Sequence, residues 1–365
     1  MTKVVFVNDS GTSEQKGALV VLQKGIHEQN IVYEEFPTLG APGQGLSALP
    51  SPQLSILLEP KVYRGAYKAQ ATAFGATLHR DSDIYALPVY KLYNFGMLAE
   101  LLAKAGITDQ DILVEYAVFG FPVKHKQAQA ALLRDLLHND GNPWTLQKEG
   151  GIQYSVRFQE VICETQPYYM AIDQIFAWQN GFLSHERGKQ LFEHGPVLFY
   201  DFGSNSSDIE WVPMSLLESE SRCVMKGTFN FLSELESLAY AKTHQEITQY
   251  DLVYHVLKHR SLTLPNGVTY DFRKEIPQLF VTAAQSAKED VSLLISELGD
   301  RPRPYTMYLG GGGAMYGKAA FIDAFTGKFF GGVHVVYDDQ GNEEPVYSIR
   351  RGMVKKAIIE YSQKG

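Results

Sequence analysis

The sequence predicts an α/β protein built from two domains. At 365 residues the chain is long for one hydrophobic core, and its length is natural for two. Apolar runs typical of strands alternate with runs whose apolar residues recur at helical spacing. One motif, an apolar strand followed by an aspartate and a glycine, occurs at Asp9 and again at Asp201. The second half therefore repeats the plan of the first.

Both copies of the motif predict a phosphate-binding turn. A carboxylate can hold hydrated Mg²⁺, which prefers one or two carboxylates together with water and phosphate oxygens. The glycine lets the backbone approach closely, and successive N–H groups can form an anion-binding concavity. Asp9 and Asp201 are thus the predicted magnesium residues, the alternative being that both only cap turns. After the strands Val4–Asn8 and Pro196–Tyr200, the two turns read Asp9, Ser10, Gly11, Thr12, Ser13 and Asp201, Phe202, Gly203, Ser204, Asn205, Ser206.

Further charged residues distinguish the copies. Lys16 follows the first turn, and Asp208 stands at the same offset in the second, where it could also bond its own hairpin backbone. A third copy, Asp339-Gln340-Gly341, is followed by Asn342 and two glutamates whose charges would repel phosphate. This third copy is therefore predicted to be a plain hairpin turn.

The first half predicts a strand meander followed by alternating helices and strands. The segment 37–60 is rich in Pro and Gly, which is typical of an insertion or a surface loop. A proline suits the first turn of the last helix of this half. The expected strands are 3–8, 17–24, 30–36, 112–119, 144–148 and 153–163, and the expected helices are 90–106, 127–138 and 167–180.

The second half predicts the same alternation. Pro265-Asn266-Gly267 is a good turn signal within a hairpin from Leu262 to Asp271. The expected strands are 196–200, 209–212, 222–225 and 306–309, and the expected helices are 228–241, 248–258, 275–298 and a closing amphipathic helix within 346–361.

The order of these motifs resembles the actin-like ATPase superfamily. The two turns are followed by the glycine run Gly310-Gly311-Gly312-Gly313-Ala314, and within the superfamily the sequence is most similar to the ParM-type plasmid-segregating bacterial actins. The resemblance covers residues 1 to about 355. Three further matches support it: Gly120-Phe121-Pro122-Val123, Glu164-Thr165-Gln166-Pro167 and Pro345-Val346-Tyr347-Ser348-Ile349-Arg350-Arg351-Gly352.

The resemblance implies an α/β, ribonuclease H-like actin fold with a nucleotide cleft between two domains. Domain I would be 1–180 with a small subdomain at about 37–90, and domain II would be 181–340 with a small subdomain at about 226–272. Residues 341–365 would form a C-terminal helix that returns to domain I.

The resemblance also implies roles for individual residues. The cofactor would be ATP or GTP with Mg²⁺, and Lys16 would neutralise charge on the β- and γ-phosphates. Glu164 would polarise the attacking water, and Gln166 is the alternative residue for this role. In a purely structural interpretation, Glu164 is an acidic residue at a helix start, where the helix dipole favours it. The remaining expected nucleotide contacts are Ser10, Gly11, Thr12, Ser13, Gly203, Ser204, Asn205, Ser206, Lys226, Gly311, Gly312, Gly313 and Met315.

A second glycine motif competes with this interpretation. Gly312, Gly317 and Lys318 fit the G-x-x-x-x-G-K pattern of a P-loop, but Ala319 stands where a P-loop needs a hydroxyl for Mg²⁺. The sequence therefore favours a glycine turn that holds the nucleoside at a helix start.

The expected function is an ATPase whose nucleotide-driven polymerisation and hydrolysis-driven disassembly segregate plasmid DNA; the alternative is a sugar- or acetate-kinase-like phosphotransferase on the same fold. A net charge of −8 and a pI near 5.7 argue against direct nucleic-acid or membrane binding, so a basic adaptor would bridge the filament to a plasmid site. Cys163 and Cys223 form neither a disulfide framework nor a zinc spacing. Without a leader or a membrane-length apolar run, the expected location is the cytoplasm.

Overall fold

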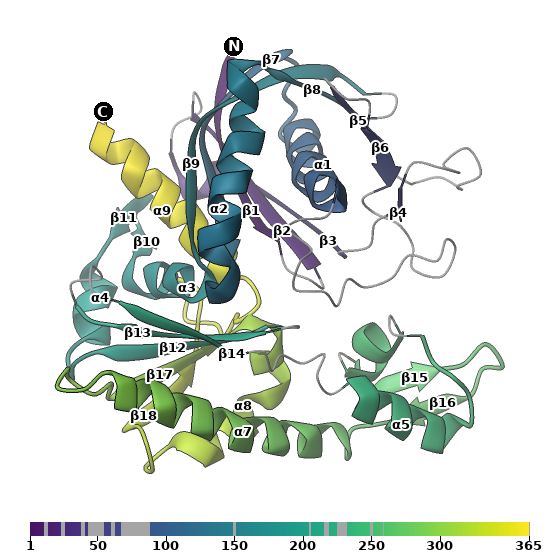
Figure 1. Cartoon of the computed structure of the whole chain (residues 1–365), viewed down its shortest axis with the longest axis vertical. Helices are drawn as coiled ribbons and strands as arrows, with labels where there is room; N and C mark the ends of the chain where they lie inside the picture. Colours follow the sequence, from purple (N-terminus) through teal and green to yellow (C-terminus); the bar gives the residue numbers. More distant parts are fainter. Residues whose placement is uncertain are drawn as a thin grey trace. The chain divides into compact units, whose positions relative to one another are not determined.

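The chain forms two compact units (Figure 1). The first consists of Met1–Glu186 together with Ile349–Gly365, and the second of Arg187–Ser348. The computed structural model describes residues 1–10, 14–22, 26–37, 41–42, 55–59, 63–66, 88–148, 151–203, 206–214, 219–224, 232–248, 251–257 and 259–364.

The first unit is built on a mixed sheet that has nine strands among the described residues. The neighbours β1, β7 and β9 run parallel, and the other neighbouring pairs are antiparallel. The carboxyl ends of these three central strands therefore meet at one edge of the sheet. In sheet order the strands are β3 (Ile31–Pro37), β2 (Glu14–Val21), β1 (Thr2–Ser10), β7 (Asp111–Phe121), β9 (Gln153–Thr165), β8 (Trp144–Lys148), β5 (Ser55–Glu59), β6 (Tyr63–Ala66) and β4 (Ala41–Pro42).

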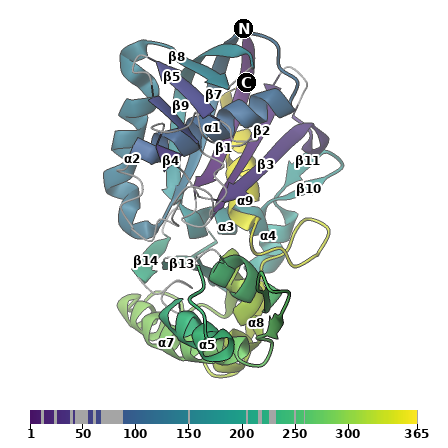
Figure 2. The ribbon, with the colours of Figure 1, turned by 90° about the vertical axis from the view of Figure 1, so that its right-hand side faces the viewer.

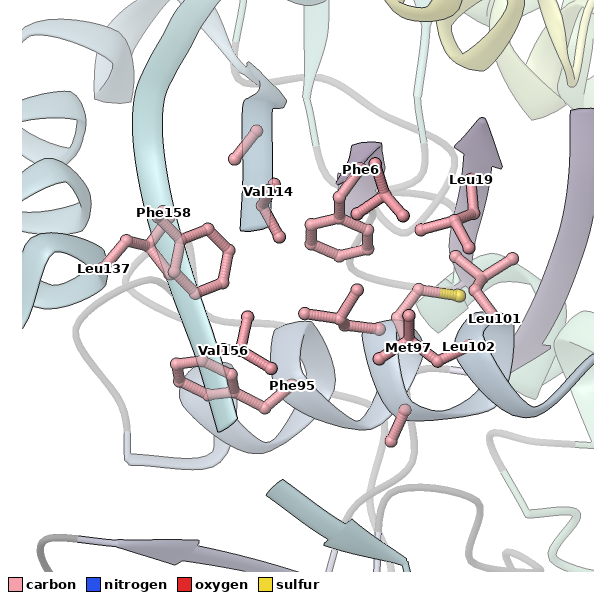
Figure 3. Packing of buried hydrophobic residues seen from close by; sticks show 14 of the residues in the cluster. Phe6, Leu19, Phe95, Met97, Leu101, Leu102, Val114, Leu137, Val156 and Phe158 are labelled. Carbon is pink, nitrogen blue, oxygen red and sulfur yellow. The ribbon is translucent and has the colours of Figure 1, made fainter. Parts of the chain in front are cut away.

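Helix α1 (Pro88–Lys104) packs on the face of this sheet that carries the main core of the unit (Figure 2). Figure 3 shows Met97 of α1 close to Phe6 and Leu19 of the sheet. A Cβ on Gly17 would lie 2.4 Å from Met97 Cγ, so the glycine lets the helix lie directly on β2. Helix α2 (Val123–His138) packs against β7 and β9 and adds Ala130, Leu133 and Leu137 to the same core.

Helix α3 (Gln166–Ile175) begins where β9 ends, and all its side chains except Tyr168 are buried. The predicted helix was wrong at its C-terminal end, because residues 177–184 form a hairpin of β10 (Ala177–Gln179) and β11 (Phe182–Ser184). Asn180 and Gly181 turn this hairpin with φ angles of 52° and 83°, the positive values that Asn-Gly turns adopt. Helix α9 (Ser348–Lys364) packs against α3 within the first unit.

The second unit is built on a sheet of five strands in the part of the chain that the structure describes. Helix α8 packs on β12 and β18, and α7 packs on α8 (Figure 1). The strands, in sheet order, are β14 (Glu220–Val224), β13 (Ser207–Val212), β12 (Val197–Phe202), β17 (Thr306–Gly310) and β18 (Gly332–Val335), and the helices are α4 (Glu186–Leu191), α5 (Leu232–Thr243), α7 (Ile276–Glu297) and α8 (Gly311–Phe325).

Two smaller features complete the unit. The predicted hairpin is confirmed as β15 (Ser261–Thr263) paired antiparallel with β16 (Thr269–Asp271), and Gly267 has a φ of 84° in its turn. A π-helical segment, Leu252–Leu257, lies in the predicted helix 248–258. No helix in the described ranges is long and apolar enough to cross a membrane.

The two units repeat one local plan. In each, an antiparallel hairpin (β1–β2 or β12–β13) is followed in the sheet by a strand parallel to its first strand (β7 or β17). The predicted structural repeat therefore exists, and each hairpin carries one of the two D-x-G motifs.

Candidate functional site

The first D-x-G motif lies in the hairpin of β1 and β2. Strand β1 runs on to Ser10, beyond its predicted end, and β2 begins at Glu14, three residues before its predicted start. Asp9 and Lys16 therefore lie within the strands and face each other in register. Ser10 pairs with Gln15, the last pair before the turn. Gly11, Thr12 and Ser13, the rest of the expected phosphate turn, lie outside the described residues.

The Asp9 carboxylate is buried and has two partners from different elements. Its side chain is nearly inaccessible at 3% exposure. Oδ1 accepts a hydrogen bond of 3.0 Å from Gln166 Nε2, and Oδ2 lies 3.9 Å from Lys16 Nζ. Lys16 Nζ also lies 3.7 Å from Glu14 Oε2. Burying a carboxylate is costly unless it is paired and hydrogen-bonded, and Gln166 and Lys16 supply these partners for Asp9.

A buried polar cluster supports this hairpin from beneath. Asn8 Nδ2 lies 2.8 Å from Ser10 Oγ and 2.7 Å from Asn94 Oδ1 of α1, and Gln15 Oε1 lies 3.3 Å from the same nitrogen. All four side chains are almost completely buried. Because buried polar groups are held firmly only when bonded, this cluster ties both strands of the hairpin to α1.

Glu164 and Gln166, the two candidates for water activation, have different surroundings. Glu164 lies inside β9, which runs on to Thr165 and is longer than predicted. Its carboxylate forms an ion pair with Lys126 of α2, and both side chains are about one-third exposed. Gln166 is the first residue of α3 and bonds to Asp9. The structure thus brings Gln166, and not Glu164, into contact with Asp9.

Gly120 explains how Gln166 reaches this position. It lies in β7 in register with Glu164, and a Cβ on it would lie 3.3 Å from Gln166 Cγ. A side chain at position 120 would press on the glutamine. The Gly120-Phe121-Pro122-Val123 match therefore has a local steric reason.

The second D-x-G motif lies in the hairpin of β12 and β13. Asp201 and Asp208 are register partners, and both side chains are buried. Ser206 Oγ lies 3.4 Å from Asp208 Oδ2, and Gly203 has the Ser206 carbonyl only 2.8 Å from where a Cβ would be. Ser204 and Asn205 fall outside the described residues.

The glycine run starts helix α8 directly beside Asp201. Gly310 is the register partner of Asp201 in the neighbouring parallel strand, and α8 begins at the next residue. Gly311 has a φ of 78°, and a Cβ on it would lie 2.3 Å from Asp201 Oδ1. A Cβ on Gly313 would lie 2.5 Å from the Phe202 ring. Only glycines let the helix start approach the aspartate this closely.

The exposed side of this helix start is formed by Gly312 and Met315. A Cβ on Gly312 would have no described neighbour within 4 Å, and Met315 is 51% exposed. Residues three apart in a helix lie on one face, so these two form one accessible surface. Lys226, the other expected nucleoside contact, lies outside the described residues.

The P-loop alternative does not fit the structure. Gly317 lies in the second turn of α8, where a Cβ would come within 2.8 Å of Phe280 of α7. Gly317 therefore allows α8 to pack closely on α7. Lys318 Nζ lies 2.7 Å from Glu343 Oε2 and so is paired with a carboxylate.

The third D-x-G copy is a closed turn, as predicted. The Asp338 carboxylate accepts the backbone N–H groups of Gln340 and Asn342 at 2.9 and 2.8 Å. Asp339 Oδ1 lies 3.0 Å from Arg187 Nη1. These contacts occupy the carboxylates with the turn itself and with α4.

Comparison with solved structures identifies the fold. The archaeal actin homolog Ta0583 in complex with ADP matches 98% of this chain and 100% of its own at 16% identity, with a TM-score of 0.69. A pCBH ParM non-polymerisable quadruple mutant matches over 100% of both chains at 14% identity, with a TM-score of 0.69. Bacillus thuringiensis ParM with ATP matches 99% of this chain and 100% of its own at 14% identity, also with a TM-score of 0.69. The chain has the actin-like fold. No family model and no curated protein matches the sequence.

Within this actin-like fold, the donor set of each hairpin fits a hydrated magnesium ion. No group of three or more His, Cys, Asp or Glu side chains that could hold a metal occurs in the described ranges. Mg²⁺ bound to a nucleotide does not need such a cage, because phosphate oxygens and waters fill most of its coordination sphere. The first hairpin offers the buried carboxylate of Asp9, and the second offers those of Asp201 and its register partner Asp208; a carboxylate is the ligand type that such an ion uses.

Sequence reasoning missed the supporting residues of the candidate site. Asn94 and Gln15 were not singled out, although a polar residue between Tyr93 and Phe95 in an apolar helical run was a usable signal. Lys126 was also missed, because its pairing with Glu164 depends on how α2 packs on β9.

Proposed function

We propose that this chain is an ATPase that binds ATP with Mg²⁺ and polymerises in response. One observation carries the proposal: in each unit a buried aspartate lies one residue before the end of the first strand of a hairpin, and the second of these aspartates lies against the glycine start of α8. Two neighbours of the same fold are described with ADP and with ATP, which supports an adenine nucleotide as ligand.

Each residue has a role that its surroundings permit. Asp9 and Asp201 would contact the hydrated Mg²⁺, and the ion would neutralise phosphate charge when bound. Lys16, 12% exposed beside Asp9, would bind phosphate oxygens. Gly311 and Gly313 would bring the N-terminus of α8, with its partial positive charge, close to the nucleotide. Glu164 would orient the attacking water once its ion pair with Lys126 opens.

The proposed filament segregates plasmid DNA through a separate adaptor. The resemblance of the sequence to plasmid-segregating actins implies the role in DNA segregation, and one ParM neighbour is described as a non-polymerisable mutant, which supports assembly as a property to test. Neutralising DNA phosphates takes clustered Lys and Arg side chains, and the net charge of this chain is −8. A basic DNA-binding partner therefore suits this chain better than direct contact with DNA.

The nucleotide part of the proposal is tested with three aspartate variants. We expect Asp9→Ala and Asp201→Ala to abolish Mg²⁺-dependent ATP binding, measured by titration calorimetry, while circular dichroism stays unchanged. Asp339→Ala is the matched control, because it removes the aspartate of a D-x-G turn that is occupied by Arg187. Parental ATP affinity in both Asp9→Ala and Asp201→Ala would refute the assignment.

The assembly part is tested by sedimentation and electron microscopy. The protein with ATP and Mg²⁺ should pellet and form filaments, and the same protein with EDTA should stay in the supernatant. Phosphate release that requires a small acceptor such as a sugar or acetate, without any pelleting, would instead identify a phosphotransferase.

A further inference from the structure

Helices α3 and α9 of the first unit cross with their backbones in contact. A Cβ on Gly352 of α9 would lie 1.8 Å from the Tyr169 carbonyl oxygen of α3. No side chain fits at this crossing. If the two helices separated or slid along each other, this close backbone contact would be lost.

A buried charge network joins the C-terminal end of α3 to α9. Asp173 has no exposed surface, and Lys355 is 1% exposed. Lys355 Nζ donates to Asp173 Oδ1 at 2.8 Å, to the Asp173 carbonyl at 3.1 Å and to the Phe176 carbonyl at 2.8 Å. Arg351 donates to Asp173 Oδ2 from Nε at 3.0 Å and from Nη2 at 2.8 Å. Lys355 thus uses all three donors and binds the negative end of the α3 dipole.

The charges in this network are mutually dependent. Burial alone would raise the pKa of the Asp173 carboxyl, but Lys355 and Arg351 hold it below its usual value. Asp173 is therefore ionised at neutral pH. In some proteins a buried polar or charged partner fixes the register of two packed helices, and the same role is tested below for this network.

The other end of α3 carries the contact with Asp9. Gln166 is its first residue and donates to Asp9 Oδ1. A Cβ built on Gly120 of β7 would lie 3.3 Å from Gln166 Cγ. The same Cβ would lie 3.5 Å from Ile349 and 3.6 Å from Met353, both of α9. Gly120 is thus flanked by Gln166 on one side and by two residues of α9 on the other, about 15 Å along α3 from its C-terminal end.

We propose that Asp173, Arg351 and Lys355 are positioning residues for the nucleotide site, because they set the position of α3 along α9 and thereby hold Gln166 against Asp9. The inference rests on the proposed function of Asp9. It assigns a role in magnesium–nucleotide binding to the C-terminal helix, which contributes no side chain to that carboxylate in the described structure.

Two variants of the full chain separate positioning from plain stability. Asp173→Asn keeps the shape and removes the charge. The triple variant Asp173→Leu, Arg351→Met, Lys355→Met replaces the network with apolar groups, a change that often leaves stability intact. Lys364→Ala is the control, because Lys364 also belongs to α9 but its ion pair, with Glu160 of β9, is exposed.

The first readout is a double-mutant cycle on Mg·ATP affinity. Gln166→Ala should weaken binding by about tenfold, the value of one hydrogen bond to a charged group. Asp173→Asn and the triple variant should weaken it by about threefold to tenfold, but by less than about twofold further in the Gln166→Ala background. Lys364→Ala should bind as the parent does.

The second readout needs no nucleotide. In protein labelled with ¹⁵N-glutamine, the Gln166 side-chain amide, assigned by its loss in Gln166→Ala, should exchange slowly in the parent and faster in the network variants.

The outcomes divide cleanly. A folded triple variant with parental Mg·ATP affinity and an unchanged Gln166 amide signal overturns the inference. So does an Asp173→Asn change that lowers Mg·ATP affinity equally in the parent and in the Gln166→Ala background. If the parent binds no nucleotide, the proposed function fails, and the amide signal still decides whether the network positions Gln166.

Discussion

Two adjacent glycines, Gly311 and Gly312, should respond in opposite ways when each is replaced by alanine: the first change should lower the stability of the second unit, and the second should raise it. Gly311 has a φ of 78°, and a Cβ there would lie 2.3 Å from Asp201 Oδ1 and 2.6 Å from the Phe202 carbonyl oxygen. Gly312, the next residue in α8, has open space around its Cβ position and ordinary helical backbone. The pair thus compares one methyl group in a crowded left-handed position with the same group in a free helical position.

The magnitudes follow from these surroundings. A non-glycine residue in the left-handed region costs about 1–2 kcal/mol, and forcing atoms into a packed place costs about 1–3 kcal/mol more. Gly311→Ala should therefore destabilise the second unit by about 2–5 kcal/mol. Gly312→Ala should stabilise it by about 0.4–1 kcal/mol, because alanine has fewer unfolded conformations to lose. For a unit of this size each kcal/mol moves the Tm by about 2–4 °C.

The assay is thermal unfolding of the nucleotide-free protein followed by circular dichroism. We expect Gly311→Ala to lower the Tm of one transition by about 4–20 °C and Gly312→Ala to raise it slightly. ATP binding at a temperature where both variants are folded should be lost in Gly311→Ala, because Asp201 must move. An unchanged Tm in Gly311→Ala, or a larger fall in Gly312→Ala, would refute the close approach of α8 to Asp201.

Two further comparisons test the assigned roles. Lys318→Ala should leave ATP hydrolysis nearly unchanged, because Lys318 is paired with the half-exposed Glu343 and such exposed pairs contribute little. Lys16→Ala should lower hydrolysis at least about tenfold. The reverse order in a phosphate-release assay would mean that the wrong lysine was chosen. Glu164→Ala should bind ATP and assemble but hydrolyse slowly, because a water-orienting group acts mainly in the transition state. If Glu164→Ala filaments turn over at the parental rate while Gln166→Ala filaments persist, water orientation belongs to Gln166.

Local patterns were sufficient for many of the elements, but they did not predict the hairpin of β10 and β11 or helix α4. The hairpin 262–271, the helix start after Gly310 and the closed turn at Asp339 follow from turn chemistry and apolar spacing, which act over a few residues. The two aspartates could be singled out for the same reason, since each directly follows an apolar run in the sequence. The end of α3 could not be placed, because the Asn180-Gly181 turn competes with a helical pattern that continues through it.

Residue order along the chain was enough to indicate that strands occur near both aspartates and where glycine was needed, although the strand ends lie up to three residues from the predicted ones. What those residues touch depends on the folded unit. Gln166 meets Asp9 because β1, β7 and β9 run parallel and end at one edge, and no spacing along the chain encodes that neighbourhood. Likewise, Lys355 reaches Asp173 only because Gly352 lets two helices from distant parts of the chain come into contact. Buried polar groups must find partners, and the packing of the whole unit selects which partners they find.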